Sequence, residues 1–256
     1  MDCREPASWG PALDEAVHVL GRGGLVVVPT DTVYGFAAEA FTPDAVASLA
    51  AATQKPDGVP PAVLVPDART VDGLCTDVPD AARALLAAFW PGRLTLVLHA
   101  QPSLAWDLGD DGRTVAVRMP DHPAALALLR RTGPLAVTGA HGAGQSPPRR
   151  AEDVLPGAGG VQLVLDAGEL AQAERSTVLD ATGAVPRLLR AGAIGLDELR
   201  AVTDVLDLDG IPGTVDRSSD VPAAEQPPAT EPHPPVQPQP PAASASGAEP
   251  PRGAER

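Results

Sequence analysis

Residues 26–35, VVVPTDTVYG, place two threonine hydroxyls, a carboxylate and the only tyrosine of the chain directly after a short apolar run. Val26 to Val28 predict a buried strand, because β-branched residues favour strands and an unbroken apolar run is typical of strands buried on both faces. Thr30 and Thr32 are two residues apart, so in an extended segment both hydroxyls point to one side, where they could bind a polar ligand. The alternative is an ordinary strand end, since proline, aspartate and glycine are common in turns.

The elements that must position these hydroxyls follow from the apolar pattern along the chain. Helices are predicted at residues 11–20, 42–52, 79–90, 123–131 and 196–202, the fourth of them with Asp121 as N-cap. Short strands are predicted at residues 25–28, 63–65, 94–98, 114–118, 135–138, 161–165, 177–180 and 187–189. The mixture indicates an α/β fold, and its irregular spacing favours a mixed twisted sheet over a doubly wound parallel one.

The end of the chain has a different composition. After about residue 209 the sequence holds twelve of its thirty prolines and no aromatic residue. Such a segment buries too little apolar surface to offset the entropy lost on ordering it. We therefore expect an N-terminal extension at residues 1–10, one α/β domain at residues 11–208 and a disordered, proline-rich tail at residues 209–256.

Acidic side chains outnumber basic ones. The net charge is −14 for the whole chain and −11 for residues 1–210, the opposite of the basic stripe of an autonomous nucleic-acid binder, so we expect any RNA contact to be small and weak. Two cysteines indicate no disulfide framework, and the histidines show no metal-ligand spacing. No apolar run approaches the roughly 18 residues of a membrane span, so we expect a cytoplasmic protein without membrane contact.

Six stretches, in order along the chain, resemble the YrdC-like family of threonylcarbamoyl-AMP synthases. They are GGLVVVPTDTVYGFAAEAF at 23–41, FWPGRLTLVL at 89–98, TVAVRMPDHP at 114–123, LAVTGAHGAGQ at 135–145, STVLDAT at 176–182 and LLRAGAI at 188–194. The resemblance extends from about residue 13 to residue 205. It implies a YrdC-like twisted mixed sheet with flanking helices around a concave cleft.

The resemblance also implies a reaction. Threonine, bicarbonate and ATP would be converted to threonylcarbamoyl-AMP and pyrophosphate, with Mg²⁺ carried by the ATP phosphates. A downstream transferase would then move the threonylcarbamoyl group onto an adenosine of certain tRNAs. Nucleotidyl transfer of this kind depends mostly on positioning and on neutralising charge.

Four matched positions would bind the substrates. Thr32 would hold threonine, and Arg118 would grip its carboxylate, because a guanidinium matches a carboxylate with two parallel hydrogen bonds. Ser176 occupies the second threonine-contacting position, and Arg190 would approach the nucleotide phosphates. The alternatives are a surface ion pair for Arg118 and a turn cap for Ser176.

The nucleotide-facing positions depart from the family pattern. The family has a lysine and an arginine two residues apart where this chain has Thr53 and Lys55. It has a serine and an asparagine where this chain has Gly139 and His141. Lys55 would then be the catalytic cation and also bind the nucleotide, with help from Thr138 and His141.

These departures leave three hypotheses open. The first is an active synthase, with or without a loss of rate from the missing donors. The second is a catalytically silent paralogue that binds threonine, a nucleotide or RNA. The third is different chemistry on the same fold, such as the use of carbamoyl phosphate.

Overall fold

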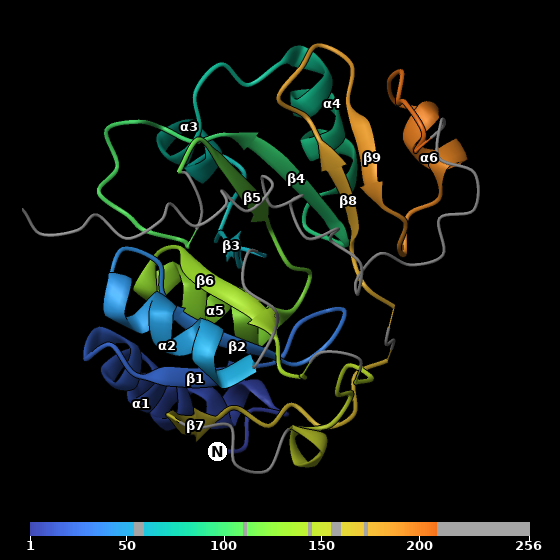
Figure 1. Cartoon of the computed structure of the whole chain (residues 1–256). Coiled ribbons are helices and arrows are strands. Elements are labelled where there is room, and N and C mark those ends of the chain that lie inside the picture. Colours follow the sequence, from blue (N-terminus) through green and yellow to red (C-terminus); the bar gives the residue numbers. More distant parts are fainter. Residues whose placement is uncertain (54–58, 110–111, 143–144, 155–159, 172–173, 209–256) are drawn as a thin grey trace, which may run out of the picture. The chain divides into compact units, whose positions relative to one another are not determined.

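The computed structural model (Figure 1) describes residues 1–53, 59–109, 112–142, 145–154, 160–171 and 174–208. All of them belong to one compact unit. Two predictions, the nucleotide contact of Lys55 and the disordered tail at residues 209–256, lie outside the described residues. The domain boundaries drawn from composition stay predictions.

Nine strands form one sheet in the order β7-β1-β2-β6-β3-β5-β4-β8-β9. The neighbours β1 and β7, β3 and β5, and β4 and β8 run parallel, whereas the other neighbouring pairs run antiparallel. The predicted mixed sheet is thus confirmed. The strands are β1 (Leu25–Val28), β2 (Gly35–Glu39), β3 (Ala62–Leu64), β4 (Leu94–His99), β5 (Thr114–Arg118), β6 (Leu135–Gly139), β7 (Val161–Val164), β8 (Thr177–Asp180) and β9 (Arg187–Arg190).

Helices cover both faces of this sheet. Val26 and Val28 of β1 pack in one apolar cluster with residues of α1 and α5, whereas Val27 packs in another with residues of α2, α3 and α4. This alternation is the reason why the run at β1 is apolar throughout, since successive side chains of a strand point to opposite faces. The helices are α1 (Trp9–Gly21), α2 (Pro43–Thr53), α3 (Thr70–Leu74), α4 (Asp80–Phe89), α5 (Pro123–Thr132) and α6 (Leu196–Arg200), with 3₁₀ turns at Pro6–Ser8 and Ala151–Asp153.

Three details differ from the sequence-based expectations. Strand β2 was not expected, because its sequence GFAAE is rich in glycine and alanine, which are depleted in strands. Helix α3 is only five residues long and contains a glycine, so it leaves little periodic signal. The predicted N-cap of α5, Asp121, is wrong: the cap is His122, whose side chain accepts a hydrogen bond from the backbone N–H of Ala125.

Tyr34 fixes the segment between β1 and β2. Its side chain is fully buried, and its hydroxyl accepts a hydrogen bond from the N–H of Ala167 at 3.0 Å and donates one to the carbonyl of Gly168 at 2.7 Å. Its backbone N–H donates to the carbonyl of Pro148 at 3.1 Å. Burial raises the pKa of Tyr34 to about 12. The loop at residues 29–34 is thereby held against residues 167–168, far away in the sequence.

We expect the substitution Tyr34→Phe to lower the free energy of unfolding by about 1–2 kcal/mol, because it leaves the half-buried N–H of Ala167 and the half-buried carbonyl of Gly168 without the tyrosine hydroxyl. Urea unfolding at pH 7 measures this loss, with the exposed Ser48→Ala as a control that should change little. A folded-state pKa of about 12 lies above the unfolded value near 10, so the tyrosine stabilises fully below pH 10 and loses this effect as the pH rises toward 12. The gap between the two proteins should therefore narrow above pH 10, and a constant gap would contradict the assignment.

Candidate functional site

Arg118, at the end of β5, is the centre of a buried polar cluster. Its Nη2 donates to the Asp31 carboxylate at 2.6 Å and its Nη1 to the Thr32 hydroxyl at 2.9 Å. Its Nε donates to the carbonyl of Gly92 at 2.9 Å. Arg118 is 6% exposed as a residue, and the side chain of Asp31 is 9% exposed. The predicted pair Thr32 and Arg118 is thus in direct contact, and the partner of the arginine is a buried aspartate.

Both members of this ion pair keep hydrogen-bonding atoms that have no partner among the described residues. A guanidinium has five N–H donors, of which three have partners among the described residues. The second carboxylate oxygen of Asp31, Oδ2, is buried and has no hydrogen-bond partner in the described part of the chain. Burial lowers the pKa of Arg118 while Asp31 opposes that shift, and an arginine stays protonated under either influence.

The two threonines of the loop have different hydrogen-bonding roles. The Thr30 hydroxyl donates to the carbonyl of Val33 at 2.7 Å and accepts from the backbone N–H groups of Thr32 and Val33 at 3.2 and 3.1 Å. These bonds use its one proton and tie it to the backbone of the turn, so Thr30 shapes the turn. The Thr32 hydroxyl accepts from Arg118 and is hydrogen-bonded to that of Thr30 at 3.0 Å. Because the Thr30 proton is on the Val33 carbonyl, Thr32 is the donor of this bond, and one lone pair of its oxygen is left for a ligand.

Ser176 and Arg190 form a second cluster. Nη2 of Arg190 donates to the Ser176 hydroxyl at 3.0 Å and to the Ser176 carbonyl at 2.9 Å, and Nε donates to the same carbonyl at 3.2 Å. The Ser176 hydroxyl lies 2.9 Å from that of Thr95 in β4. A Cβ at Gly192 would lie 2.6 Å from the carbonyl carbon of Ser176, so only glycine lets the backbones of these two segments approach so closely.

Strand pairing places the two clusters side by side. Leu96 pairs with Val117 across β4 and β5, so one step further along the ladder Thr95 comes opposite Arg118. Thr95 also pairs with Val178 in β8, two residues after Ser176. Residues directly opposite, or two apart, share one face of a sheet. The structure therefore brings four predicted residues to one face of the sheet: Thr32, Arg118, Ser176 and Arg190.

The nucleotide-facing candidates gather at the end of β6. Thr138 pairs with Phe36 of β2, and the N–H of Ala140 donates to the carbonyl of Tyr34 at 2.9 Å, which joins this segment to the loop after β1. The ring of His141 folds back over Gly139: a Cβ added at Gly139 would lie 2.6 Å from Nδ1 of that ring. The imidazole thus occupies the space that a side chain at position 139 would need.

Thr53 lies beside this turn, at the end of α2. A Cβ at Gly142 would be 3.7 Å from the Thr53 carbonyl oxygen. The Thr53 hydroxyl donates to the carbonyl of Ala50 at 2.9 Å, and the residue is 2% exposed. The Thr53 hydroxyl is therefore hydrogen-bonded within its own helix, and the residue brings no charge to a ligand.

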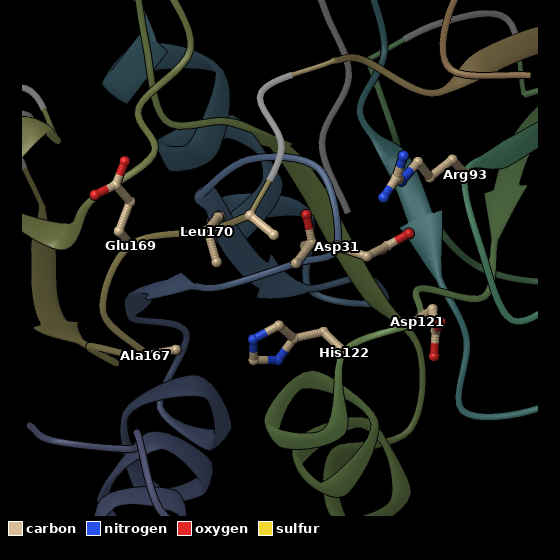
Figure 2. Close-up of a pocket in the computed structure, with 9 residues that line it drawn as sticks. Asp31, Arg93, Asp121, His122, Ala167, Glu169 and Leu170 are labelled. Carbon is tan, nitrogen blue, oxygen red and sulfur yellow. The ribbon is translucent and has the colours of Figure 1, made fainter.

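A cavity of about 290 Å³ opens next to the Arg118 cluster. Figure 2 shows Asp31, Arg93, Asp121 and His122 around it, with the segment of Ala167 and Leu170 on the other side. None of the four residues Thr32, Arg118, Ser176 and Arg190 lines this cavity. The remaining lining residues are Thr30, Glu169 and Ala171.

Sequence analysis missed three residues of this region. Asp31 was taken for a turn residue, although its position between two threonines after a buried strand is a usable signal. Thr95 stands among apolar neighbours in β4, where a lone buried polar residue indicates a hydrogen-bonding role. His122 was considered only as a metal ligand. Among the described residues no group of three or more histidine, cysteine or acidic side chains could hold a metal ion, and no helix is long and apolar enough to span a membrane.

Comparison with known proteins shows which family the chain resembles. The model of the Sua5, YciO and YrdC proteins, described as "Telomere recombination", matches residues 18–192. A protein of Mycobacterium tuberculosis strain H37Rv, provisionally named a threonylcarbamoyl-AMP synthase, is 45% identical over 206 residues, covering 80% of this chain and 95% of that protein. The chain belongs to the Sua5/YciO/YrdC family.

Further members of the Sua5/YciO/YrdC family give the same result. The threonylcarbamoyl-AMP synthase of Bacillus subtilis is 36% identical over 202 residues, which cover 78% of this chain and 58% of that enzyme. The crystal structure of Pyrococcus abyssi Sua5 complexed with L-threonine superposes with a TM-score of 0.74 at 32% identity, covering 80% of this chain and 62% of that one. Escherichia coli YciO, at 24% identity and a TM-score of 0.68, shares the fold.

The packing of His141 on Gly139 makes the two family departures at β6 interdependent. We expect Gly139→Ser to cost about 1–3 kcal/mol of stability, because the new side chain meets the buried ring. Combining it with His141→Asn, which removes the ring, should recover most of that loss, with a coupling of about 0.5–3 kcal/mol in the double-mutant cycle.

Thermal or urea unfolding of the four proteins measures this coupling. Gly183→Ser is the matched control, because nothing lies within 4 Å of a Cβ at that exposed glycine. If the effects of the two substitutions on the free energy of unfolding were additive, the His141 ring would not compete with a side chain at position 139 for the same space.

Proposed function

We propose that the chain forms threonylcarbamoyl-AMP and pyrophosphate from threonine, bicarbonate and ATP. The observation that carries the proposal is the joining of Arg118 and Thr32 to Arg190 and Ser176 on one face of the sheet. One buried and one half-buried guanidinium group, each bonded to a hydroxyl, suit a reaction whose substrates all carry anionic oxygens. The relatives named threonylcarbamoyl-AMP synthases support the same conclusion.

Threonine binding falls to the first cluster. Arg118 has two N–H donors left after its bonds to Asp31, Thr32 and Gly92, enough for one carboxylate. The Thr32 hydroxyl, held by Thr30 and Arg118, adds one acceptor position for the substrate. Ser176 contributes its hydroxyl from the second cluster. The P. abyssi relative whose structure contains L-threonine supports this assignment.

We assign nucleotide binding to the residues outside the Arg118 cluster. Arg190, beside Ser176, faces the phosphates, with Thr138 and His141 as further donors and Lys55 as the catalytic cation. Threonine is first carboxylated on its nitrogen, and the carbamate oxygen then attacks the α-phosphorus of ATP as pyrophosphate leaves. The protein contributes positioning and positive charge, and Mg²⁺ arrives bound to the phosphates.

The product of this reaction would be the substrate of a second enzyme. Threonylcarbamoyl-AMP is a reactive mixed anhydride, so a transferase that passes its acyl group to tRNA must act downstream. The net charge of −11 over residues 1–210 disfavours a broad RNA groove, so direct RNA contact is limited to a small, salt-sensitive patch.

Pyrophosphate release tests the reaction. The purified protein, given Mg²⁺, ATP and bicarbonate, should release pyrophosphate only when threonine is added. Mass spectrometry should then detect threonylcarbamoyl-AMP. Threonine binding without pyrophosphate release would overturn the proposed reaction and support the silent paralogue, and release driven by carbamoyl phosphate alone would support the third hypothesis.

The role of Arg118 can be tested by binding. We expect Arg118→Ala to weaken threonine binding by about 2 kcal/mol or more, because it removes the cation that pairs with the substrate carboxylate. Isothermal titration with threonine measures the loss. Arg83→Ala, which breaks an exposed pair with Asp72, is the control and should leave binding unchanged.

Because Arg118→Ala also leaves Asp31 buried without its partner, the folded state is checked by circular dichroism and by the conservative Arg118→Lys. The lysine keeps the charge but loses the bond to Gly92. Threonine affinity equal to that of the unsubstituted protein in a folded Arg118→Ala variant would contradict the placement of the amino-acid site.

A further inference from the structure

Asp166 closes a tight turn shortly after β7. Its Oδ1 accepts the backbone N–H of Gly168 at 2.8 Å, and its Oδ2 accepts Nη2 of Arg4 at 2.7 Å. Its backbone N–H donates to the carbonyl of Met1 and its carbonyl accepts from the N–H of Cys3, both at 2.8 Å. Burial acts to raise the pKa of Asp166, but the Gly168 N–H and Arg4 outweigh it and hold that pKa below its usual value. The side chain is therefore a carboxylate at neutral pH, and it fixes the turn together with its own backbone.

Tyr34 is bound by this turn, which comprises residues 166–168. The two residues that follow Asp166 supply both partners of the Tyr34 hydroxyl: the N–H of Ala167 donates to it at 3.0 Å, and it donates to the carbonyl of Gly168 at 2.7 Å. Both bonds depend on the relative placement of these two backbone groups, because hydrogen bonds are directional. The Gly168 N–H that Asp166 binds belongs to the peptide group between them. Loss of the bond to Asp166 would therefore free the peptide group on which the Tyr34 contacts depend.

Tyr34 in turn ends the loop that carries Thr32. The Thr32 hydroxyl accepts from Arg118 at 2.9 Å, and two residues later the Tyr34 side chain binds the turn at residues 166–168. Two residues of extended chain span at most about 7 Å, so a shift of Tyr34 cannot be absorbed before it reaches Thr32. The loop is thus held by Arg118 at one end and, through the tyrosine hydroxyl, by the turn at the other.

We propose that Asp166 is a positioning residue of the amino-acid site. Its carboxylate fixes the turn, the turn fixes Tyr34, and Tyr34 fixes the loop that carries Thr32. This inference rests on the proposed function, in which the Thr32 hydroxyl contacts threonine. Asp166 itself touches no substrate, so its whole effect on threonine binding passes through the Tyr34 hydroxyl.

Isothermal titration with threonine compares two substitutions that differ in one hydrogen bond. Asp166→Ala removes the acceptor of the Gly168 N–H, and we expect it to weaken threonine binding about three- to tenfold, the effect of one hydrogen bond. Asp166→Asn loses the charge but keeps an amide oxygen that can accept the same N–H, so its threonine affinity should stay within about twofold of that of the unsubstituted protein. An equal loss in both variants would assign the effect to the charge and overturn the proposal. An unchanged affinity in a folded Asp166→Ala protein would also overturn it.

Asp166→Glu supplies the opposite comparison. It keeps the charge but moves the carboxylate one methylene group further from the backbone, so it should weaken threonine binding as Asp166→Ala does. This variant takes the place of Asp166→Ala if circular dichroism shows that the alanine variant does not fold, and an unchanged affinity would again contradict the proposal. Asp72→Ala is the matched control: Asp72 of α3 likewise pairs with an arginine, Arg83, at 2.9 Å, and its loss should leave threonine binding unchanged.

A double-mutant cycle with Tyr34→Phe tests the route itself. Tyr34→Phe removes the hydroxyl through which Asp166 acts, so adding Asp166→Ala should cause no further loss of threonine affinity. Losses that multiply in the double variant would show that the two residues act independently and would overturn the proposal. A purely structural role, which lowers the free energy of unfolding but not the threonine affinity of the folded protein, would overturn it as well.

The ionisation of Tyr34 gives a spectroscopic readout of the same turn. Tyr34 is the only tyrosine of the chain, so phenolate absorbance reports on it alone. Burial raises its pKa to about 12, the Ala167 N–H opposes that shift, and the charge of Asp166 raises the pKa further. Both Asp166→Asn and Asp166→Ala should therefore lower the pH at which the phenolate forms. Asp166→Ala should lower it more, because only this variant frees the turn, and equal titration curves of the two variants would contradict the role of the turn.

The outcomes also distinguish this inference from the proposed reaction. Threonine binding that depends on Asp166 through Tyr34, without pyrophosphate release, would leave the positioning role standing and overturn the synthase function. Threonine-dependent pyrophosphate release by a protein whose threonine affinity does not depend on Asp166 would do the reverse.

Discussion

The buried ion pair between Arg118 and Asp31 is the constraint on which the rest of the site depends. Two charges at 7% and 9% side-chain exposure are stable only when they are paired and hydrogen-bonded. The pair therefore fixes the loop after β1 against the end of β5, two segments separated by more than eighty residues. The same guanidinium orients the Thr32 hydroxyl. Under the proposed function, disrupting the pair would affect the fold and threonine binding together, because the same guanidinium would serve both.

A second consequence is that each arginine of the sheet face uses most of its donors on the protein itself. Arg118 uses three of five on Asp31, Thr32 and Gly92, and Arg190 bonds three times to Ser176. Such use makes the guanidinium rigid, and a rigid donor loses less entropy when it binds an anion. Two positive charges of this acidic protein are thus held in fixed orientations on the face where the proposed anionic substrates would lie.

The sequence predicts the parts of this site that follow from periodicity and from matched motifs. The strand before Thr32 and the one ending at Arg118 are both apolar runs with clear ends, and the structure confirms both strands. Contacts between distant segments are another matter, because no local pattern records which partner a buried side chain finds. In the sequence Asp31 has the features of a turn residue, and only the structure shows its ion pair with Arg118. His122 displaces Asp121 as N-cap for a similar reason, since several short polar residues before a helix can each cap it.

The packing at the end of β6 has a chemical consequence for the proposed nucleotide end of the site. With no side chain at Gly139, the ring of His141 occupies that space and Thr53 bonds to its own helix. Neither an imidazole nor a hydroxyl carries the permanent positive charge of a lysine, and nucleotidyl transfer depends on neutralising phosphate charge. In the proposed reaction, Arg190, Lys55 and the metal ion bound to ATP would supply this positive charge. At the proposed amino-acid end, by contrast, Arg118 and its hydroxyl partners are in place. The two halves of the proposed reaction therefore place unequal demands on this chain, because threonine binding would use groups that are already positioned, whereas ATP activation would need positive charge from outside the β6 turn.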